Sequence, residues 1–557
     1  MKFAKSLARY APDWRTVLSG FMIVVAFPPW DMSSLIWIAL IPWFSALDRS
    51  KSMKSACLQS FWLGFLMSLG GFYWIASVLI EFAEVPTFLG ILGLLLYSTV
   101  GQAQLYLFTP LYRKLNDVMP VRTQAWRLAG GSILLALAYT GIDWILPKLF
   151  VDTFGHALYN APRMRQVADI GGPTLLTFMI FLMNHSLWLL YKRLRSRSEP
   201  SIWPAIAKTA PQLLVALSLC LGGCIYGHYR GIQIQELTDH PIENVQMAVI
   251  QANIGDFDKV AAEHGMRGAR ETILGTFYGM SDEALAMTPK PNAVIWPETS
   301  YPSTFRTPEV AEEMNADQRL ETFVRSRGVP LYFGGYDRDG QKDYNAFFFL
   351  SPHPVPGLLG EGDLQIYRKN MLLMFGEVIP GAEYFNFLKR AFPQVGNFGR
   401  GVGPVTLDLP LTHKTLSSFK VGPIICYEAL FPNYVIASAR QGSQMILNIT
   451  NDSWFGPHGE PYLHLALIAF RGIETRLPQL RSTNTGISTL ILPNGEITHP
   501  TSVGTKVIMN VTVPLIKPVW TLMLAWGDWF GPTSLIIGLG GLIGLLWSRS
   551  RRRATSR

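Results

Sequence analysis

The sequence predicts two parts of different fold class: a multi-span α-helical membrane domain, and an α/β domain built on a mixed sheet covered by helices. Three observations lead to this prediction. Of 557 residues, 49% are hydrophobic and only 16% are charged, which is a skewed composition for a soluble protein. The apolar residues gather in long runs before about residue 227 and again at 530–547. Between these regions, short β-rich runs alternate with amphipathic helices.

The long apolar runs, which are typical of membrane helices, divide the chain into three segments. We expect an N-terminal membrane domain at 1–230 with about seven transmembrane helices, an α/β domain at 241–514, and a C-terminal transmembrane helix with a basic tail at 515–557. Residues 1–27 resemble a secretory signal, but Phe27-Pro28-Pro29-Trp30 stands where small residues would mark a cleavage site. We therefore interpret them as a retained membrane segment. The other apolar runs lie at 35–47, 57–79, 86–108, 133–146, 174–191 and 213–226.

Several of these runs are shorter than the roughly 20 residues that an upright helix needs, so the first two fit a shallow hairpin pair. Two ionisable residues, Asp143 and His185, lie inside predicted spans, where we favour structural roles over functional ones. Gly540 and Gly544 have the spacing that lets two helices approach closely.

The net charge of +9 belongs to clusters of Lys and Arg that flank the apolar runs. This pattern favours membrane orientation over nucleic-acid binding, since basic residues collect in cytoplasmic loops. The clusters occur at the N-terminus, at 49–54, 113–127 and 192–197, and at the C-terminal arginines, whereas 28–34 and 81–85 carry none. Seven crossings from a cytoplasmic N-terminus would place the α/β domain outside, and an eighth would return the tail to the cytoplasm.

A candidate nucleophile lies in the α/β domain, where the apolar run Pro423-Ile424-Ile425 leads to Cys426. Cys57, Cys220 and Cys224 lie in predicted spans, so Cys426 is the only thiol of a domain expected in an oxidising compartment. A thiol has a pKa of about 8.5 and needs a neighbouring base or cation to become a useful nucleophile. The alternative is a small buried apolar cysteine.

Two other strand ends offer the partners that such a thiol needs. Glu298 follows the run 292–295, and Lys369 ends the run 364–369. A desolvated carboxylate can accept the thiol proton, and a buried ammonium can neutralise an oxyanion. The alternatives are a surface carboxylate after a turn proline and an ordinary solvated lysine.

The remaining expected elements complete the α/β pattern. We expect strands at 245–254, 292–295, 330–335, 344–350, 364–369, 419–426, 445–450, 486–492 and 507–513, and helices within 256–287, 311–328 and 462–476. The aromatic segment 371–403 has no strand character and is interpreted as a lid or an arm against the bilayer, or alternatively as part of the domain's own core.

Several motifs together resemble the nitrilase superfamily and, within it, the membrane-embedded apolipoprotein N-acyltransferase family. The motifs are Trp296-Pro297-Glu298-Thr299-Ser300, Tyr367-Arg368-Lys369, Phe375-Gly376-Glu377, Cys426-Tyr427-Glu428, Asn451-Asp452-Ser453-Trp454-Phe455-Gly456 and Arg481-Ser482-Thr483-Asn484. Their order, inside this membrane topology, extends the resemblance over almost the whole chain. The one departure is Leu373-Met374, where the family usually shows Val-Pro.

The resemblance implies a nitrilase-like αββα sandwich with a Glu-Lys-Cys triad. In this sequence Cys426 would be the nucleophile, Glu298 the general base and Lys369 the stabiliser of the oxyanion. Glu377 would be an additional active-site carboxylate, and Tyr427 and Glu428 would flank the nucleophile. No cofactor or metal is expected, since a two-step covalent transfer needs neither.

The implied function is transfer of a fatty acyl chain from a membrane phospholipid, through a cysteine thioester, to the N-terminal amine of a lipoprotein's lipidated cysteine. The family's usual donor is phosphatidylethanolamine and its acceptor a diacylglyceryl-cysteine apolipoprotein. The expected location is the bacterial inner membrane, with the catalytic domain periplasmic and both termini cytoplasmic. Two alternatives remain: a membrane-tethered nitrilase-like amidohydrolase that gives the thioester to water, and a non-catalytic transporter or scaffold.

Overall fold

A computed structural model describes residues 10–82, 85–119, 124–195, 202–255, 268–340, 342–352, 363–374, 376–379, 398–411 and 416–555. The chain divides into two compact units. The first contains Met1–Gly231 together with Asp528–Arg557, and the second contains Ile232–Gly527. The C-terminal helix therefore belongs with the N-terminal region rather than with the segment that precedes it.

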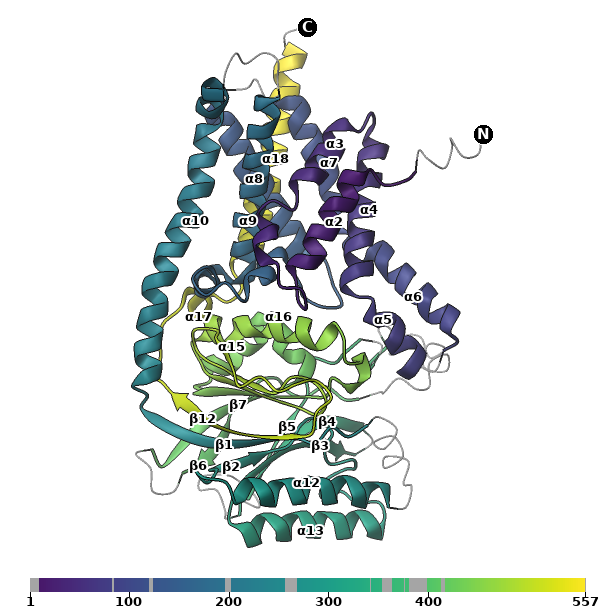
Figure 1. Ribbon diagram of the computed structural model, residues 1–557, viewed down its shortest axis with the longest axis vertical. Coiled ribbons are helices and arrows are strands. Elements are labelled where there is room, and N and C mark those ends of the chain that lie inside the picture. The colour runs from purple at the N-terminus through teal and green to yellow at the C-terminus, as the bar shows by residue number, and fades with distance from the viewer. Residues whose placement is uncertain are drawn as a thin grey trace. The chain divides into compact units, whose positions relative to one another are not determined.

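The first unit is helical (Figure 1). Its α-helices are α2 (Trp14–Ala26), α3 (Ile41–Arg49), α4 (Met53–Gly71), α5 (Trp74–Ser77), α6 (Thr87–Val100), α7 (Gln104–Val118), α8 (Ala125–Ile145), α9 (Ala168–Leu194), most of α10 (Ile202–Asp239) and α18 (Phe530–Thr555). In the described part of the chain, five helices are long and apolar enough to cross a membrane, or six if the bent pair at Met53–Gly71 and Trp74–Glu81 is one span. Helix α2, with 13 residues, and helix α3, with 9, are shorter. The number of spans stays a prediction.

Close backbone contact joins α8 to α18. A Cβ added at Gly538 would lie 2.3 Å from the backbone nitrogen of Ala138, and one at Gly141 would lie 2.3 Å from the Cα of Leu535. A Cβ at Gly540 or Gly544 would meet nothing within 4 Å, so the spacing of those two glycines was the wrong signal for this interface. Glycine is needed where a second helix backbone takes the place of the side chain.

The two ionisable residues predicted inside the spans have polar partners. Asp143 pairs with Lys148, with 2.6 Å between Oδ1 and Nζ, and His185 Nδ1 lies 3.1 Å from Ser132 Oγ. These contacts fit the structural roles favoured from the sequence, because a buried polar group is costly without a partner.

The second unit contains two six-stranded mixed sheets. The strand orders are β12-β1-β2-β3-β4-β5 and β11-β10-β9-β8-β7-β6. The strands are β1 (Glu243–Gln251), β2 (Ala293–Ile295), β3 (Leu331–Asp339), β4 (Lys342–Leu350), β5 (Leu364–Arg368), β6 (Leu407–Pro410), β7 (Ser418–Ile425), β8 (Met445–Thr450), β9 (Gln479–Thr483), β10 (Thr489–Ile491), β11 (Ile497–Thr498) and β12 (Val507–Leu515). Parallel pairing joins β1 to β2 to β3 in one sheet and β7 to β8 to β9 in the other.

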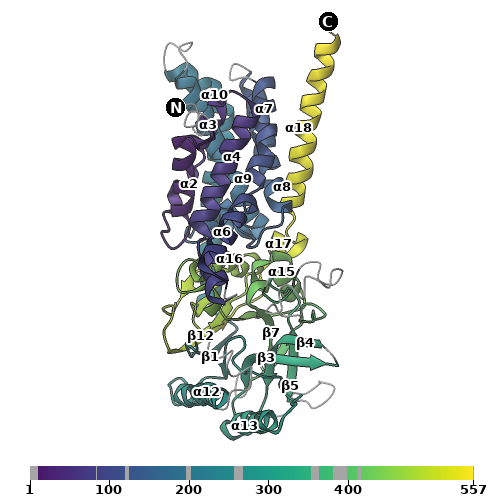
Figure 2. The ribbon, with the colours of Figure 1, turned by 90° about the vertical axis from the view of Figure 1, so that its right-hand side faces the viewer.

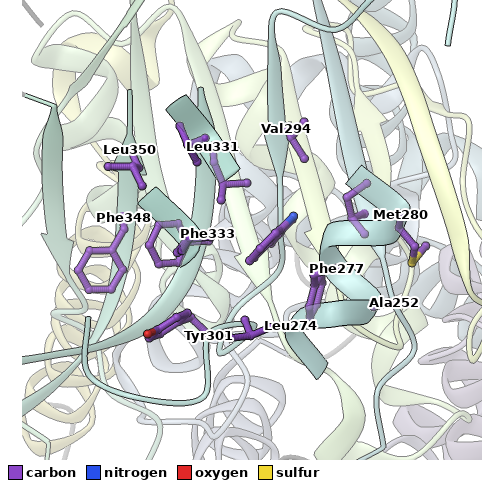
Figure 3. Close-up of a cluster of buried hydrophobic side chains, with 14 of the residues drawn as sticks. Ala252, Leu274, Phe277, Met280, Val294, Tyr301, Leu331, Phe333, Phe348 and Leu350 are labelled. Carbon is purple, nitrogen blue, oxygen red and sulfur yellow. The ribbon is translucent and has the colours of Figure 1, made fainter. Parts of the chain in front are cut away.

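Helices cover the outer face of each sheet. Figures 1 and 2 show α12 (Ala269–Leu285) and α13 (Ala311–Arg327) on the first sheet, and α15 (Pro432–Arg440) and α16 (Glu460–Thr475) on the second. The fold is therefore the αββα sandwich expected of a nitrilase-like domain. Figure 3 shows Phe277 of α12 in one buried cluster with Phe333 and Phe348 of the first sheet, all at 0% exposure. Phe277 stacks on Trp296, with 4.9 Å between ring centroids, and Phe333 stacks on Phe348 at 5.0 Å. Burial of each such ring stabilises the layer by about 1.5–3 kcal/mol.

Most predicted elements of this domain are present within a few residues of their expected ends. The strands β6, β9 and β11 and the helix α15 were not expected. Two of these four, β6 and β11, are very short and lie at a sheet edge, where apolar periodicity is weak. The expected lid at 371–403 lies largely outside the described residues.

Candidate active site

Two strand ends bring a carboxylate and an ammonium together. Glu298 follows β2 by three residues, and Lys369 directly follows β5, where its backbone N–H donates to Asn345 of β4 at 2.8 Å. Lys369 Nζ lies 3.2 Å from Glu298 Oε1 and 2.8 Å from Glu377 Oε1. The side chains of Lys369 and Glu298 are 2% and 5% exposed, so this is a buried ion-pair network.

Two asparagines hold the carboxylates in place. The Nδ2 group of Asn345 donates to Oε1 of both Glu298 and Glu377, each at 2.8 Å. The backbone N–H of Asn451, just after β8, donates to Glu298 Oε2 at 2.8 Å. Glu377 Oε2 also accepts from the N–H of Leu373 at 2.8 Å. Every oxygen of the two carboxylates therefore has a donor, which fixes their orientation.

A close backbone approach sets the position of Glu298. A Cβ added at Gly334 of β3 would lie 2.6 Å from the Cα of Glu298 and 2.7 Å from the nitrogen of Thr299. Position 334 thus needs glycine, because the backbone that carries Glu298 fills the space a side chain would take.

Cys426 begins the turn that follows β7. Its φ of 49° lies in the left-handed region, which is rare for a residue with a side chain and is typical of functional turns. The carboxylate of Glu428 closes the turn. Its Oε2 accepts from the N–H of Ile425 at 2.8 Å and from the hydroxyl of Tyr367 at 2.6 Å, and its Oε1 accepts from the N–H of Asn370 at 2.7 Å.

These contacts tie the turn at Cys426 to the end of β5. Glu428 therefore positions the residues at both strand ends, because it accepts hydrogen bonds from the ends of β5 and β7. Tyr427 is buried and packs edge-on against Phe431, with 5.1 Å between ring centroids.

Electrostatics link Cys426 to the buried network. Burial raises the pKa of the Cys426 thiol well above its usual range, Glu298 raises it further, and Lys369 opposes both. Burial alone would lower the pKa of Lys369, but the charges of Glu298 and Glu377 hold it well above its ordinary value. The resting site therefore contains a neutral thiol and an ammonium between two carboxylates.

The structure brings Glu298, Lys369 and Glu377 into direct contact and places Cys426 within electrostatic reach of all three. Sequence reasoning did not single out Asn345, which lies inside β4 without a motif. Asn451 was part of a motif, but only its backbone N–H reaches Glu298, and a sequence does not reveal such a contact.

A second charged cluster follows Asn451. In the described part of the chain, Asp452, Glu460 and His464 form a group whose donor atoms all lie within 4.8 Å of one another. Arg481 Nη2 lies 2.7 Å from Asp452 Oδ2, so a guanidinium already supplies the positive charge there. We describe the group as an ion-pair network.

Matches to two protein-family models agree with this architecture. Residues 19–186 match the apolipoprotein N-acyltransferase N-terminal domain, and residues 246–517 match the carbon-nitrogen hydrolase domain. An amidase from Nesterenkonia sp. of known structure is 17% identical, covers 49% of this chain and 91% of that chain, and has a TM-score of 0.34.

Three curated relatives carry the name apolipoprotein N-acyltransferase. The protein from Bdellovibrio bacteriovorus is 32% identical over 97% of this chain and 96% of its own length. Those from Geobacter metallireducens and Chlorobaculum tepidum are 28% and 26% identical and cover 90% and 97% of this chain. With both domains matched and a relative aligned along nearly its full length, the chain belongs to the apolipoprotein N-acyltransferase family.

Proposed function

We propose that this protein N-acylates lipoproteins in the membrane, using Cys426 as the nucleophile, Glu298 as the general base and Lys369 as the stabiliser of the oxyanion. The observation that carries the proposal is the buried ammonium of Lys369 between the carboxylates of Glu298 and Glu377. Family membership supports the overall activity, and this network supports the assignment of roles.

In the first half-reaction the Cys426 sulfur attacks the carbonyl carbon of a phospholipid acyl ester while Glu298 takes the thiol proton. Negative charge develops on the carbonyl oxygen, where Lys369 stabilises it. The ester C–O bond then breaks, Glu298 returns its proton to the departing alkoxide, and a lysophospholipid leaves. The acyl chain stays on Cys426 as a thioester.

In the second half-reaction the free amine of the lipoprotein's N-terminal cysteine attacks the thioester carbonyl. Glu298 takes a proton from the amine, an amide bond forms, and the carbon–sulfur bond breaks. The sulfur leaves as a thiolate and regains the proton from Glu298. Glu377 holds Lys369 throughout, and Tyr427 and Glu428 support the turn that carries Cys426.

We infer that the donor is phosphatidylethanolamine and the acceptor a diacylglyceryl-cysteine apolipoprotein. Both substrates are bilayer-bound, which gives the membrane helices a chemical purpose, because an acyl-enzyme must be kept from water. We place the catalytic domain on the periplasmic side of the inner membrane with both termini cytoplasmic. The basic clusters that flank the apolar runs support this orientation.

The direct test is incubation of the purified protein with phosphatidylethanolamine alone, followed by intact-protein mass spectrometry. We expect one acyl chain added to the wild-type protein, removed by hydroxylamine, and no addition to Cys426→Ala. A wild-type protein that releases lysophospholipid without carrying the acyl chain would contradict the covalent mechanism.

Product identity distinguishes transfer from hydrolysis. When a diacylglyceryl-cysteine peptide is added to the acylated protein, we expect an N-acylated peptide. Release of free fatty acid at the same rate with and without the peptide would favour the amidohydrolase alternative. Normal complementation by Cys426→Ala would favour a non-catalytic role.

A further inference from the structure

The charged cluster after β8, formed by Asp452, Glu460, His464 and Arg481, is almost fully buried. Glu460 begins helix α16 and His464 lies one turn later on the same helix, at 0% and 2% exposure. His464 Nδ1 is 3.2 Å from Glu460 Oε1 and 3.4 Å from Asp452 Oδ1. The charged groups that face His464 are Glu460 on its own helix, Asp452 after β8, and Arg481 on β9.

The charges of this cluster balance when the pair of His464 and Glu460 carries one extra proton. Asp452 and Glu460 contribute two negative charges and Arg481 one positive charge, all in a region from which water is excluded. Arg481 donates to Asp452 Oδ2 at 2.7 Å and to Asn448 Oδ1 at 3.0 Å, and its Nη2 also lies 3.2 Å from His464 Nδ1. Asp452 Oδ1 and both oxygens of Glu460 have no hydrogen-bond donor among the described residues, so a proton held by the pair of His464 and Glu460 balances the negative charge there. An unbalanced buried carboxylate would be costly.

The electrostatic environment of the two side chains agrees with this charge balance. Burial and Arg481 would lower the pKa of His464, but its contacts with Asp452 and Glu460 raise it above the ordinary value. Burial, with the charge of Asp452, raises the pKa of Glu460 to about 7. The pair therefore retains a proton at neutral pH.

The cluster is connected to the candidate active site through one short turn. Asp452 follows Asn451, whose N–H donates to Glu298 Oε2 at 2.8 Å. Asp452 has little room to move, because a Cβ at Gly486 would lie 2.0 Å from its Oδ2. The charge of Asp452 also raises the pKa of the Cys426 thiol, so whatever neutralises Asp452 acts on the thiol as well.

We propose that His464 is a positioning residue of this enzyme, which holds a proton together with Glu460, contacts Asp452, and so fixes the turn after β8 and aligns Glu298 through the Asn451 amide. It also screens the charge of Asp452 from Cys426. This inference rests on the proposed function for its link to acyl transfer, but its geometry is independent of the substrate.

The experiment uses the full-length protein in phosphatidylethanolamine-containing nanodiscs. In His464→Gln we expect acyl-adduct formation to slow about 10-fold, with an unchanged apparent KM for the phospholipid, since small misplacements of a catalytic group cost up to about 100-fold. The matched control is His240→Gln, an exposed histidine of the same unit, which should leave the rate unchanged. A normal rate in His464→Gln would overturn the proposal.

Alkylation of Cys426 by iodoacetamide separates positioning from general loosening of the site. Without the proton that His464 and Glu460 hold, the unscreened charge of Asp452 should slow alkylation at pH 8, whereas a loosened site would expose the thiol and react faster. Faster alkylation of His464→Gln therefore overturns the proposal. A wild-type protein that forms no acyl adduct would refute the proposed function, while this comparison would still decide the role of His464.

The charge balance of the cluster predicts that a second substitution, at Glu460, restores the activity lost in His464→Gln. Adding Glu460→Gln to His464→Gln leaves Asp452 paired with Arg481 and no uncompensated carboxylate, so the double variant should recover most of the lost rate and thermal stability. Such coupling is measured by a double-mutant cycle. If His464→Gln does not fold, the double variant must still fold and acylate. Its failure to do so, or strictly additive effects of the two changes, would overturn the proposal.

Discussion

Lys369 is the residue on which the electrostatic balance of the site depends. It is 2% exposed and is the positive charge that Glu298 and Glu377 share. Without it, two buried carboxylates would face each other across Asn345, which donates to both. The same ammonium counteracts the effects that raise the pKa of the Cys426 thiol. One side chain therefore affects the stability of the site, the alignment of the proposed base Glu298 and the ionisation of the proposed nucleophile Cys426.

Replacing Lys369 by methionine should reduce acyl-adduct formation by about 100- to 1000-fold, since loss of one oxyanion donor costs about 2.7–4 kcal/mol. The variant should also be less stable by about 3–5 kcal/mol, because the buried carboxylates lose their partner. Single-turnover acylation and thermal unfolding measure the two effects. Lys420→Met, an exposed lysine on the strand that leads to Cys426, is the matched control and should change neither.

Glu298→Gln should change two reactions of Cys426 in opposite directions. The charge of Glu298 raises the pKa of the thiol, so its removal should increase the thiolate fraction and speed iodoacetamide alkylation at pH 8. Acyl-adduct formation should fall by about 100-fold or more, because the general base is lost. The measurement needs Cys57, Cys220 and Cys224 replaced by alanine, so that Cys426 is the only thiol. Parallel loss of both reactions would contradict the role of a base.

At the scale of elements, the site forms where parallel strands end. Glu298 follows β2 and Cys426 follows β7, and each of these strands has a parallel neighbour. Antiparallel β5 supplies Lys369 from the sheet that contains β2. The carboxylate of Glu428 then joins the ends of β5 and β7, so the two sheets contribute to one buried network.

The sequence allowed the strands that carry Glu298, Lys369 and Cys426 to be predicted, because apolar runs end at each of these residues. Hydrophobic periodicity does not predict the contacts that hold these three side chains in place. Asn345 acts from the middle of β4, Asn451 through its backbone, and Gly334 through the absence of a side chain. The sequence also pointed to the wrong glycines for the contact between α8 and α18. Small residues with helical spacing occur on many helix faces, and in the structure Gly538, not Gly540, lies against the neighbouring helix.

The close approach of β3 to the Glu298 turn gives an element-scale prediction. Gly334→Ala should displace the backbone at Glu298, because its Cβ would lie 2.6 Å from the Cα of that residue. We expect acylation to fall by about 100-fold, as misplacement by about 1 Å can cause. Gly279→Ala on α12 is the control, because a Cβ there meets nothing within 4 Å, and it should be neutral or stabilising by up to about 1 kcal/mol. Equal effects of the two substitutions would argue against the backbone contact.

At the scale of the whole molecule, helix α18 belongs to the N-terminal helical unit although the whole second unit separates the two in sequence. Residues 232–527 form a complete domain inserted between the N-terminal helices and α18. Helix α18 nevertheless packs on α8, where Trp144 Nε1 donates to Asp528 Oδ2 at 2.7 Å. The insertion therefore begins and ends at membrane-type helices, α10 and α18.

Cysteine labelling tests on which side of the membrane the α/β domain lies. In a background in which all four cysteines are replaced by alanine, Glu312→Cys on the exposed face of α13 should react with a membrane-impermeant maleimide in intact spheroplasts. Ser548→Cys near the end of α18, beside the C-terminal arginines, should react only after permeabilisation, because basic clusters stay in the cytoplasm. Labelling of both positions in permeabilised cells is the control for accessibility. Protection of Glu312→Cys in intact spheroplasts would reverse the proposed orientation, and would also separate the proposed active site from acceptors exposed on the periplasmic surface.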